Sequence, residues 1–161
     1  MAKFTPEGIH DVQFRVMHSG SIIDLDSHVI EVLKNYPDSQ LFVGTDSQNI
    51  AHKTVYVTTI VFRYPQRGAH VVYYKHVQPR IWDMWTRLWK ETEKSIELAD
   101  YLRQELKVPI AQIDMDYNEN PDFPSNKVLK AAKGFIESLG FTAKAKPNIT
   151  LACWAANALC H

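Results

Sequence analysis

The sequence predicts a mixed α/β fold in which helices flank a five-stranded mixed sheet. Three observations support this prediction. The chain has 161 residues, of which 45% are hydrophobic, and this is enough for one domain with a substantial core. Three β-patterned segments follow one another between residues 41 and 77. Two further strand-like segments then alternate with helical ones, which requires crossover connections and therefore a mixed sheet.

Charge and composition exclude several classes of protein. Lys plus Arg equals Asp plus Glu, at 18 each, so no overall positive field attracts nucleic acid, and such binding depends on local clusters. No apolar run approaches the roughly 18 residues that span a bilayer, and the N-terminus lacks the apolar core of a signal peptide. Cys153 and Cys160 are too far apart on one helix for a disulfide. We therefore expect a cytoplasmic protein with free thiols and no membrane partner, whose oligomeric state the sequence does not determine.

The first 39 residues are expected to form a helical extension. Phe14, Val16 and Met17 suggest a short strand or an arm. Asp26 or Ser27 can cap a short helix that runs to about Tyr36. The expected apolar face of this helix consists of Val29, Ile30, Val32 and Leu33.

The expected core of the fold follows this extension. Three strands, Leu41–Val43, Val55–Phe62 and Ala69–Val77, should form an antiparallel meander. A long helix should run from about Trp82 to Leu106, because no Pro or Gly interrupts it. Its inward stripe steps by three and four residues: Met84, Leu88, Glu91, Ser95, Leu98 and Leu102.

The remaining elements alternate strand and helix. Ile110–Asp116 has the pattern of a strand, and Ser125 caps a helix that Gly140 ends. Phe141–Lys146 is a short strand, and a last helix runs to about Leu159. This is the element order of the ribonuclease H-like fold. We expect one such domain over residues 1–161, with its core at about 40–159 and the extension at about 1–39.

Acidic residues on two predicted strands are the first candidates for a functional site. Asp46 follows the apolar run Leu41–Val43, and Gly44 before it allows a neighbouring element to approach closely. Asp114 and Asp116 share strand parity, so their like charges repel on one face unless a cation or proton lies between them. Each aspartate also has a structural interpretation, at a strand edge or as a cap. Together they favour a site for a hard divalent cation such as Mg²⁺.

Glu91 is the third candidate, because it falls inside the apolar stripe of the long helix, between Leu88 and Ser95. Burying a carboxylate without a partner is costly. The structural alternative is an ion pair with Arg87 or Lys94 at helical spacing. Ser95 is small, so one turn beyond Glu91 it would let the helix lie close to a strand.

Two weaker patterns concern contact with nucleic acid. Trp82, Trp85 and Trp89 form an aromatic stripe, which is typical of core or partner contacts, with base stacking as the functional alternative. A set of lysines is either a solvated face or an edge that contacts phosphates; its members are Lys127, Lys130, Lys133, Lys144 and Lys146.

These residues make the chain similar to the bacterial YkuK-type family, a ribonuclease H-like group. The more specific matching blocks are Phe42–Gln48 (FVGTDSQ) and Arg87-Leu88 with Glu91-Thr92. Weaker blocks extend the similarity over most of the chain: Arg67-Gly68, Ser95–Ala99, Ile113–Asp116, Ser125, Gly140-Phe141 and Lys146-Pro147.

The resemblance implies an acidic site that binds Mg²⁺ or Mn²⁺ and cleaves phosphodiesters by a two-metal mechanism. By position, Asp46, Glu91 and Asp116 are the implied catalytic and metal-binding carboxylates. Asp114 is an auxiliary candidate ligand, where the family tends to have histidine. Asn157 stands where superfamily nucleases commonly have a fourth acidic residue, and its carbonyl oxygen can ligate without contributing charge.

We therefore expect a divalent-metal-dependent nuclease that acts on RNA, DNA or a hybrid. The alternative is a catalytically weak or inactive module that binds nucleic acid or serves as a scaffold. The uncharged Asn157 and the zero net charge of the chain motivate this alternative.

Overall fold

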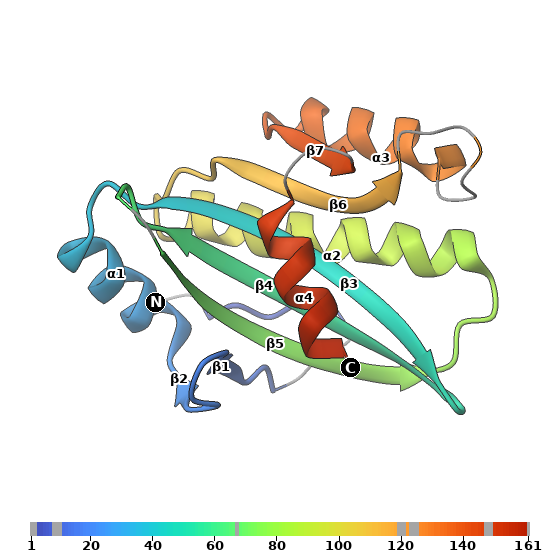
Figure 1. The fold of residues 1–161 in the computed structure, drawn as a ribbon, viewed down its shortest axis with the longest axis horizontal. Coiled ribbons are helices and arrows are strands. Elements are labelled where there is room, and N and C mark those ends of the chain that lie inside the picture. Colours follow the sequence, from blue (N-terminus) through green and yellow to red (C-terminus); the bar gives the residue numbers. More distant parts are fainter. Residues whose placement is uncertain are drawn as a thin grey trace.

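The fold is built around a mixed β-sheet (Figure 1). The computed structural model describes residues 3–7, 11–66, 68–118, 122, 126–146 and 150–160. Within these residues the sheet has seven strands in the order β2-β1-β5-β4-β3-β6-β7. The strands are β1 (Phe14–Val16), β2 (Ile22–Ile23), β3 (Gln40–Ile50), β4 (Lys53–Arg63), β5 (Ala69–Pro79), β6 (Gln112–Asn118) and β7 (Ala143–Lys146). The helices are α1 (Leu25–Asn35), α2 (Met84–Gln104), α3 (Asn126–Ser138) and α4 (Leu151–Cys160).

The pairing of the strands confirms the predicted mixed sheet. Strands β3, β4 and β5 form the expected antiparallel meander. Strand β6 pairs parallel with β3, and β7 pairs parallel with β6. Strand β3 is therefore an interior strand, with an antiparallel neighbour on one side and a parallel neighbour on the other. Helices α2 and α3 provide the crossovers from β5 to β6 and from β6 to β7.

The prediction of five strands is wrong in number, because the N-terminal segment adds two. Strand β1 pairs antiparallel with β5, and β2 pairs antiparallel with β1. Strand β1 covers part of the edge of β5, at Val72 and Tyr73, whose backbone groups would otherwise lack partners. The short strand suggested by Phe14, Val16 and Met17 is confirmed over Phe14–Val16, and Met17 lies just beyond it. Strand β2, Ile22–Ile23, is too short to show a two-residue period.

Helix α1 begins earlier than the sequence indicated. Its N-cap is Asp24, whose carboxylate accepts a hydrogen bond from the Ser27 backbone N–H at 3.1 Å. The predicted caps, Asp26 and Ser27, lie inside the helix instead. Ile30 was expected on the apolar face but is 54% exposed, because the buried stripe is narrow and consists of Leu25, Val29 and Val32.

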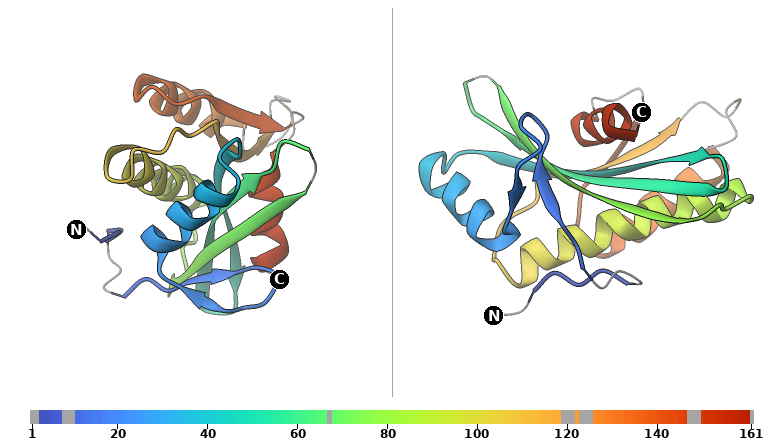
Figure 2. Two further views of the ribbon diagram at one scale, coloured as in Figure 1. Left: turned by 90° about the vertical axis from the view of Figure 1, so that its left-hand side faces the viewer. Right: turned by 90° about the horizontal axis from the view of Figure 1, so that it is seen from below.

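Helices cover both faces of the sheet (Figure 2). Helices α1, α2 and α3 lie on one face and share a large apolar core with it, in which Val29, Leu98 and Ile136 are fully buried. Helix α4 lies on the other face and packs against Phe42 and Val61 through a smaller apolar cluster. None of the described helices is both long and apolar enough to cross a lipid bilayer.

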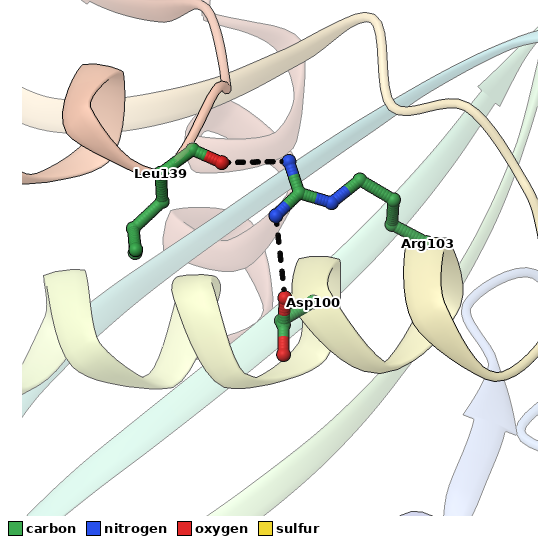
Figure 3. Close-up of polar contacts among 3 residues, drawn as sticks. All are labelled: Asp100, Arg103 and Leu139. Atoms are coloured by element: carbon green, nitrogen blue, oxygen red, sulfur yellow. Dashed lines mark hydrogen bonds and ion pairs between the residues drawn. The ribbon is translucent and has the colours of Figure 1, made fainter.

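Arg103 joins the C-terminal ends of α2 and α3 (Figure 3). Its guanidinium donates to the Leu139 carbonyl at 2.8 Å and forms an ion pair with Asp100 at 3.3 Å. The same group lies 3.8 Å from the ring centroid of Phe141. Gly140 ends this region with a φ of +87°, as the predicted helix stop requires. This contact links α2 to the segment that follows α3.

The inward stripe of α2 is confirmed beyond its first residue. Leu88, Glu91, Ser95, Leu98 and Leu102 are buried, whereas Met84 is exposed in the first turn. Asp83 caps the helix by accepting from the Thr86 backbone N–H at 3.0 Å. The predicted cap of α3, Ser125, lies outside the described residues.

Candidate metal centre

Three carboxylates meet where β3 and β6 stop pairing. The parallel ladder between the two strands ends at Gly44 and Asp114, and Asp46 and Asp116 lie two residues further along their strands. Because side chains alternate along a strand, these two aspartates share one face of the sheet. Oxygen atoms of Asp46, Asp116 and Glu91 all lie within 4.8 Å of one another. The structure therefore brings together three of the residues singled out in the sequence.

Glu91 reaches this cluster from α2, on the opposite face of the sheet. One turn beyond it, Ser95 Oγ lies 2.7 Å from Thr45 Oγ1, so the small side chain lets the helix approach β3 closely, as expected. Glu91 Oε2 accepts a hydrogen bond from Ser47 Oγ at 3.2 Å. Its other oxygen, Oε1, is buried and has no hydrogen-bond partner among the described residues. A buried carboxylate oxygen without a donor is a ready ligand for a cation.

The structural alternative for Glu91 is not observed. Neither Arg87 nor Lys94 forms an ion pair with it in the part of the chain that the structure describes. Lys94 Nζ lies 3.0 Å from His76 Nδ1 instead. The position of Glu91 in the apolar stripe is therefore not explained by a helical salt bridge.

The electrostatics of the cluster are unfavourable without a cation. The pKa of Asp46 is raised to about 6, first by burial and then by the negative charge of Asp116. Burial raises the pKa of Glu91 well above its ordinary value, and the charges of Asp46 and Asp116 raise it further. Hard divalent cations prefer carboxylate oxygens as ligands, and a cation between these three carboxylates would offset their mutual repulsion. The residues present therefore fit a divalent cation.

Ser47 supports the site and was not singled out from the sequence. Its backbone N–H donates to Asp46 Oδ1 at 2.9 Å, while its hydroxyl binds Glu91. Adjacent residues of a strand face opposite sides, so Ser47 points toward α2 whereas Asp46 points toward α4. The sequence offered one signal for this role. Ser47 is a polar residue directly after Asp46, and it lies two residues after Thr45, so both face the same side of the strand.

Helix α4 docks on β3 at Gly44. A Cβ atom at Gly44 would lie 2.9 Å from both Ala152 Cβ and Cys153 N, so only glycine permits this contact. Thr59 Oγ1 donates to the Ala152 carbonyl at 2.8 Å from the neighbouring strand. The close approach predicted for Gly44 is confirmed, and it places α4 over the acidic cluster.

Asp114 lies apart from the three clustered carboxylates. Its Oδ2 accepts a hydrogen bond from the Ala152 backbone N–H at 2.7 Å, at the N-terminus of α4. Its Oδ1 accepts from Gln112 Nε2. Burial raises the pKa of Asp114 to about 6, whereas the bonds from Gln112, Ala152 and Cys153 lower it. The structure thus places Asp114 as an anchor for α4, and its role as an auxiliary metal ligand stays a prediction.

Asn157 lies beside the cluster, on α4. Its Nδ2 donates a hydrogen bond to Asp46 Oδ2 at 2.8 Å. In this orientation the amide presents a donor rather than the carbonyl oxygen that would bind a cation. The role of Asn157 as a metal ligand also stays a prediction. Its observed contact is with Asp46, which is itself a candidate ligand.

The predicted basic cluster lies mainly on α3. Lys127 and Lys130 are exposed, Lys133 is half-buried, and Lys144 is exposed on β7. The side chain of Lys146 lies outside what the structure describes. Contact between these lysines and nucleic acid stays a prediction.

The cysteines show no sign of thiol chemistry. Cys153 and Cys160 are free, as the sequence indicated, and both are buried. Burial raises the pKa of both thiols, and neighbouring carboxylates raise it further. Thiolates are therefore disfavoured at ordinary pH.

Comparison with known proteins identifies the family. No curated protein matches the chain. A family model described as "Ribonuclease H-like" matches residues 25–161, which is most of the chain and agrees with the resemblance seen in the sequence. The match begins at the first residue of α1 and includes the three clustered carboxylates. The chain therefore belongs to the ribonuclease H-like family.

Proposed function

We propose that this protein is a divalent-metal-dependent nuclease of the two-metal type. The observation that carries the proposal is the convergence of Asp46, Glu91 and Asp116, whose oxygens lie within 4.8 Å of one another. The buried, unpartnered Oε1 of Glu91 supports it, because a cation is the kind of partner that this atom lacks. Mg²⁺ and Mn²⁺ are the candidate ions, since both bind carboxylate oxygen.

The three carboxylates would hold the metal. A divalent ion bound there supplies Lewis-acid stabilisation of phosphate oxygens and lowers the pKa of water at the site. The chain's own residues fix the ligands in place. Hydrogen bonds from Ser47 N–H and Asn157 Nδ2 orient both oxygens of Asp46, and the Ser47 hydroxyl orients Glu91. Such preorganisation avoids the cost of arranging ligands during the reaction.

The substrate class follows from the family and the local charge. Exposed lysines on α3, Lys127 and Lys130, are available to contact phosphates near the end of β6 that carries Asp116. The substrate would be a nucleic acid, as RNA, DNA or a hybrid.

Metal binding and cleavage test this proposal together. Titration calorimetry with Mn²⁺ should detect binding to the wild type and little or none to Asp46→Asn, which lacks one charged ligand. Cleavage of labelled RNA, DNA and hybrid strands with Mn²⁺ should be lost in the same variant. Asp38→Asn is the matched control, since Asp38 is an exposed carboxylate in the turn before β3. Equal Mn²⁺ binding by wild type and Asp46→Asn would refute the site.

A non-catalytic module that binds nucleic acid or serves as a scaffold is the second candidate. The observation that favours it is Asn157, which contributes a donor where a fourth carboxylate would contribute charge. This function predicts that the wild type binds oligonucleotides without cutting any of them, even when Mn²⁺ is bound. Wild type and Asp46→Asn are purified in parallel to detect contaminating nucleases, because a contaminant would give both preparations the same rate of cleavage.

A further inference from the structure

A short segment between β5 and α2 presents a tryptophan to solvent. Trp82 is 78% exposed, and Trp85, in the first turn of α2, is 45% exposed. The third tryptophan of this stripe, Trp89, packs against Phe135 and the main core. Two large exposed aromatic side chains three residues apart make this segment a candidate surface for contact with a partner.

Hydrogen bonds hold this segment in one conformation. The Ile81 N–H donates to Thr54 Oγ1 at 2.8 Å, and the Ile81 carbonyl accepts from Asn49 Nδ2 at 3.1 Å. The Arg80 N–H donates to the His52 carbonyl at 2.9 Å. The residue before Trp82 is thus fixed on both sides to the β3–β4 hairpin. The backbone next to the exposed ring is therefore held in place, which lowers the entropy lost when the ring binds a partner.

A positive charge accompanies the ring. The guanidinium of Arg80 lies 4.3 Å from the centroid of the Trp82 ring, and its Nη1 donates to the Ala51 carbonyl at 2.8 Å. One side of the indole is thus next to a cation, while most of the side chain stays open. The carboxylate of Asp83 accepts hydrogen bonds from the Thr86 backbone N–H and hydroxyl at the start of α2. Lys53 is exposed in the adjacent β3–β4 hairpin. An aromatic surface beside the half-buried Arg80 guanidinium and the exposed Lys53 complements a base and its phosphate.

The platform of Arg80 and Trp82 lies near the acidic cluster along both β3 and α2. Asn49, which holds Ile81, lies three residues beyond Asp46 on β3, a distance of about 10 Å along a strand. Trp85 precedes Glu91 by six residues on α2, which is about 9 Å along a helix. In Figure 1 the β3–β4 hairpin and the start of α2 lie at the same end of the sheet. A strand that enters the acidic cluster would reach the platform within a few nucleotides.

We infer that Trp82 and Arg80 form a base-stacking platform for single-stranded nucleic acid, which leads the strand into the acidic cluster. This inference rests on the proposed nuclease function and specifies its substrate as a single strand or an overhang. Bases within a duplex are already stacked on their neighbours, so only an unpaired base offers a face to the indole. Arg80 contacts the phosphate next to the stacked base.

Binding in the absence of metal tests the platform separately from cleavage. The probes are a labelled oligo(dT) strand and a blunt DNA duplex, titrated with protein in EDTA and followed by fluorescence anisotropy. Trp82→Ala should bind oligo(dT) about 5- to 150-fold more weakly, as expected for one lost base stack, and should bind the duplex as the wild type does. Trp82→Phe keeps an aromatic face and should retain most of the affinity. Arg80→Gln should reduce the salt slope for oligo(dT) by about 0.7.

Tyr36→Ala is the control, because Tyr36 is an exposed aromatic residue beside the β4–β5 turn and should not affect binding. Unchanged oligo(dT) affinity in Trp82→Ala, or an equal loss on the duplex, would overturn the inference. Self-association of the wild type that Trp82→Ala abolishes would also overturn it, because the surface would then bind a second copy of the chain. Cleavage by the wild type with unchanged binding by Trp82→Ala would refute the platform and leave the nuclease proposal intact. Weaker binding without any cleavage would support the platform and count against the nuclease.

Discussion

Asn157 donates a hydrogen bond from Nδ2 to Asp46 Oδ2 at 2.8 Å, across the gap between α4 and β3. This bond favours the ionised form of Asp46, although burial and Asp116 raise the pKa of that carboxyl to about 6. An amide at this position therefore stabilises one candidate ligand without adding charge to the cluster.

Asn157→Asp should strengthen metal binding. A fourth carboxylate adds negative charge beside Asp46, which favours a divalent cation and disfavours the metal-free state. We expect the Mn²⁺ concentration for half-maximal binding to fall by about tenfold, as measured by calorimetry. Asn157→Ala, which only removes the hydrogen bond, should bind Mn²⁺ no better than the wild type. If Asn157→Asp binds Mn²⁺ more weakly than the wild type, the residue does not face the metal.

The metal-free protein should lose stability as pH rises through the range of about 4 to 6. The folded-state pKa of Asp46 is raised to about 6 from an ordinary 3.8, so the folded state binds more protons than the unfolded state between these values. Asp46→Asn removes this penalty and should make the metal-free protein more stable at pH 7 by about 1–2 kcal/mol, with a smaller gain at pH 4.

Urea denaturation in EDTA at several pH values measures this effect, with Asp38→Asn as the control. Saturating Mn²⁺ should reverse the order of stability, because the ion binds the folded wild type and not the variant. Identical pH profiles for wild type and Asp46→Asn would show that folding does not raise the pKa of the Asp46 carboxyl.

Gly44→Ala should destabilise the fold by about 1–3 kcal/mol. The new Cβ would lie 2.9 Å from Ala152 Cβ and from Cys153 N, so α4 must shift away from β3. Gly134→Ala is the matched control, because nothing lies within 4 Å of a Cβ at Gly134 on α3. Alanine is the better helix former, so this control should gain about 0.5–1 kcal/mol. Chemical denaturation of both variants gives the comparison, and a neutral Gly44→Ala would mean that α4 is not packed this closely.

Asp114→Ala should separate an anchoring role from a metal-binding role. The change leaves the Ala152 N–H and the Gln112 amide without their acceptor, at an expected cost of about 1–3 kcal/mol in the free energy of unfolding. Mn²⁺ affinity should stay near that of the wild type at a temperature where the variant is folded. A large loss of affinity with little loss of stability would instead make Asp114 a ligand.

Replacing Lys127 and Lys130 together by Glu should weaken oligonucleotide binding and lower its salt dependence. Each lost phosphate contact should reduce the slope of log affinity against log salt by about 0.7–0.9. The charge-matched control is Lys34→Glu with Lys107→Glu, two exposed lysines on α1 and after α2. If both double variants show the same slope, the effect reflects net charge alone and α3 is not part of the interface.

The sequence determined much of the fold through local periodicity. The two-residue period of β4 and β5 and the helical stripe of α2 are properties of neighbouring residues, so both were predictable. The C-terminal end of β3 was not predictable in this way. Its apolar run ends at Val43, but the strand continues to Ile50 and turns at Ala51, which adopts a φ of 51° without the glycine or asparagine that usually marks such a turn. Pairing with β4 along its whole length overrides the polar residues after Val43.

The sequence also singled out the acidic residues: Asp46 by its place after an apolar run, Asp114 and Asp116 by their shared strand parity, and Glu91 by the helical stripe. The preference for Asp116 over Asp114 came from the family resemblance. Each period sets the direction of a side chain relative to its own element. Which of these directions meet is a property of the tertiary structure. The parallel register of Gly44 with Asp114 ends just before the two aspartates, and this places Asp116 beside Asp46. The docking of α4 on Gly44 turns Asp114 into an anchor and brings the Asn157 amide to Asp46. These contacts join residues far apart in the chain, so register and helix docking decide them, and no local pattern encodes either.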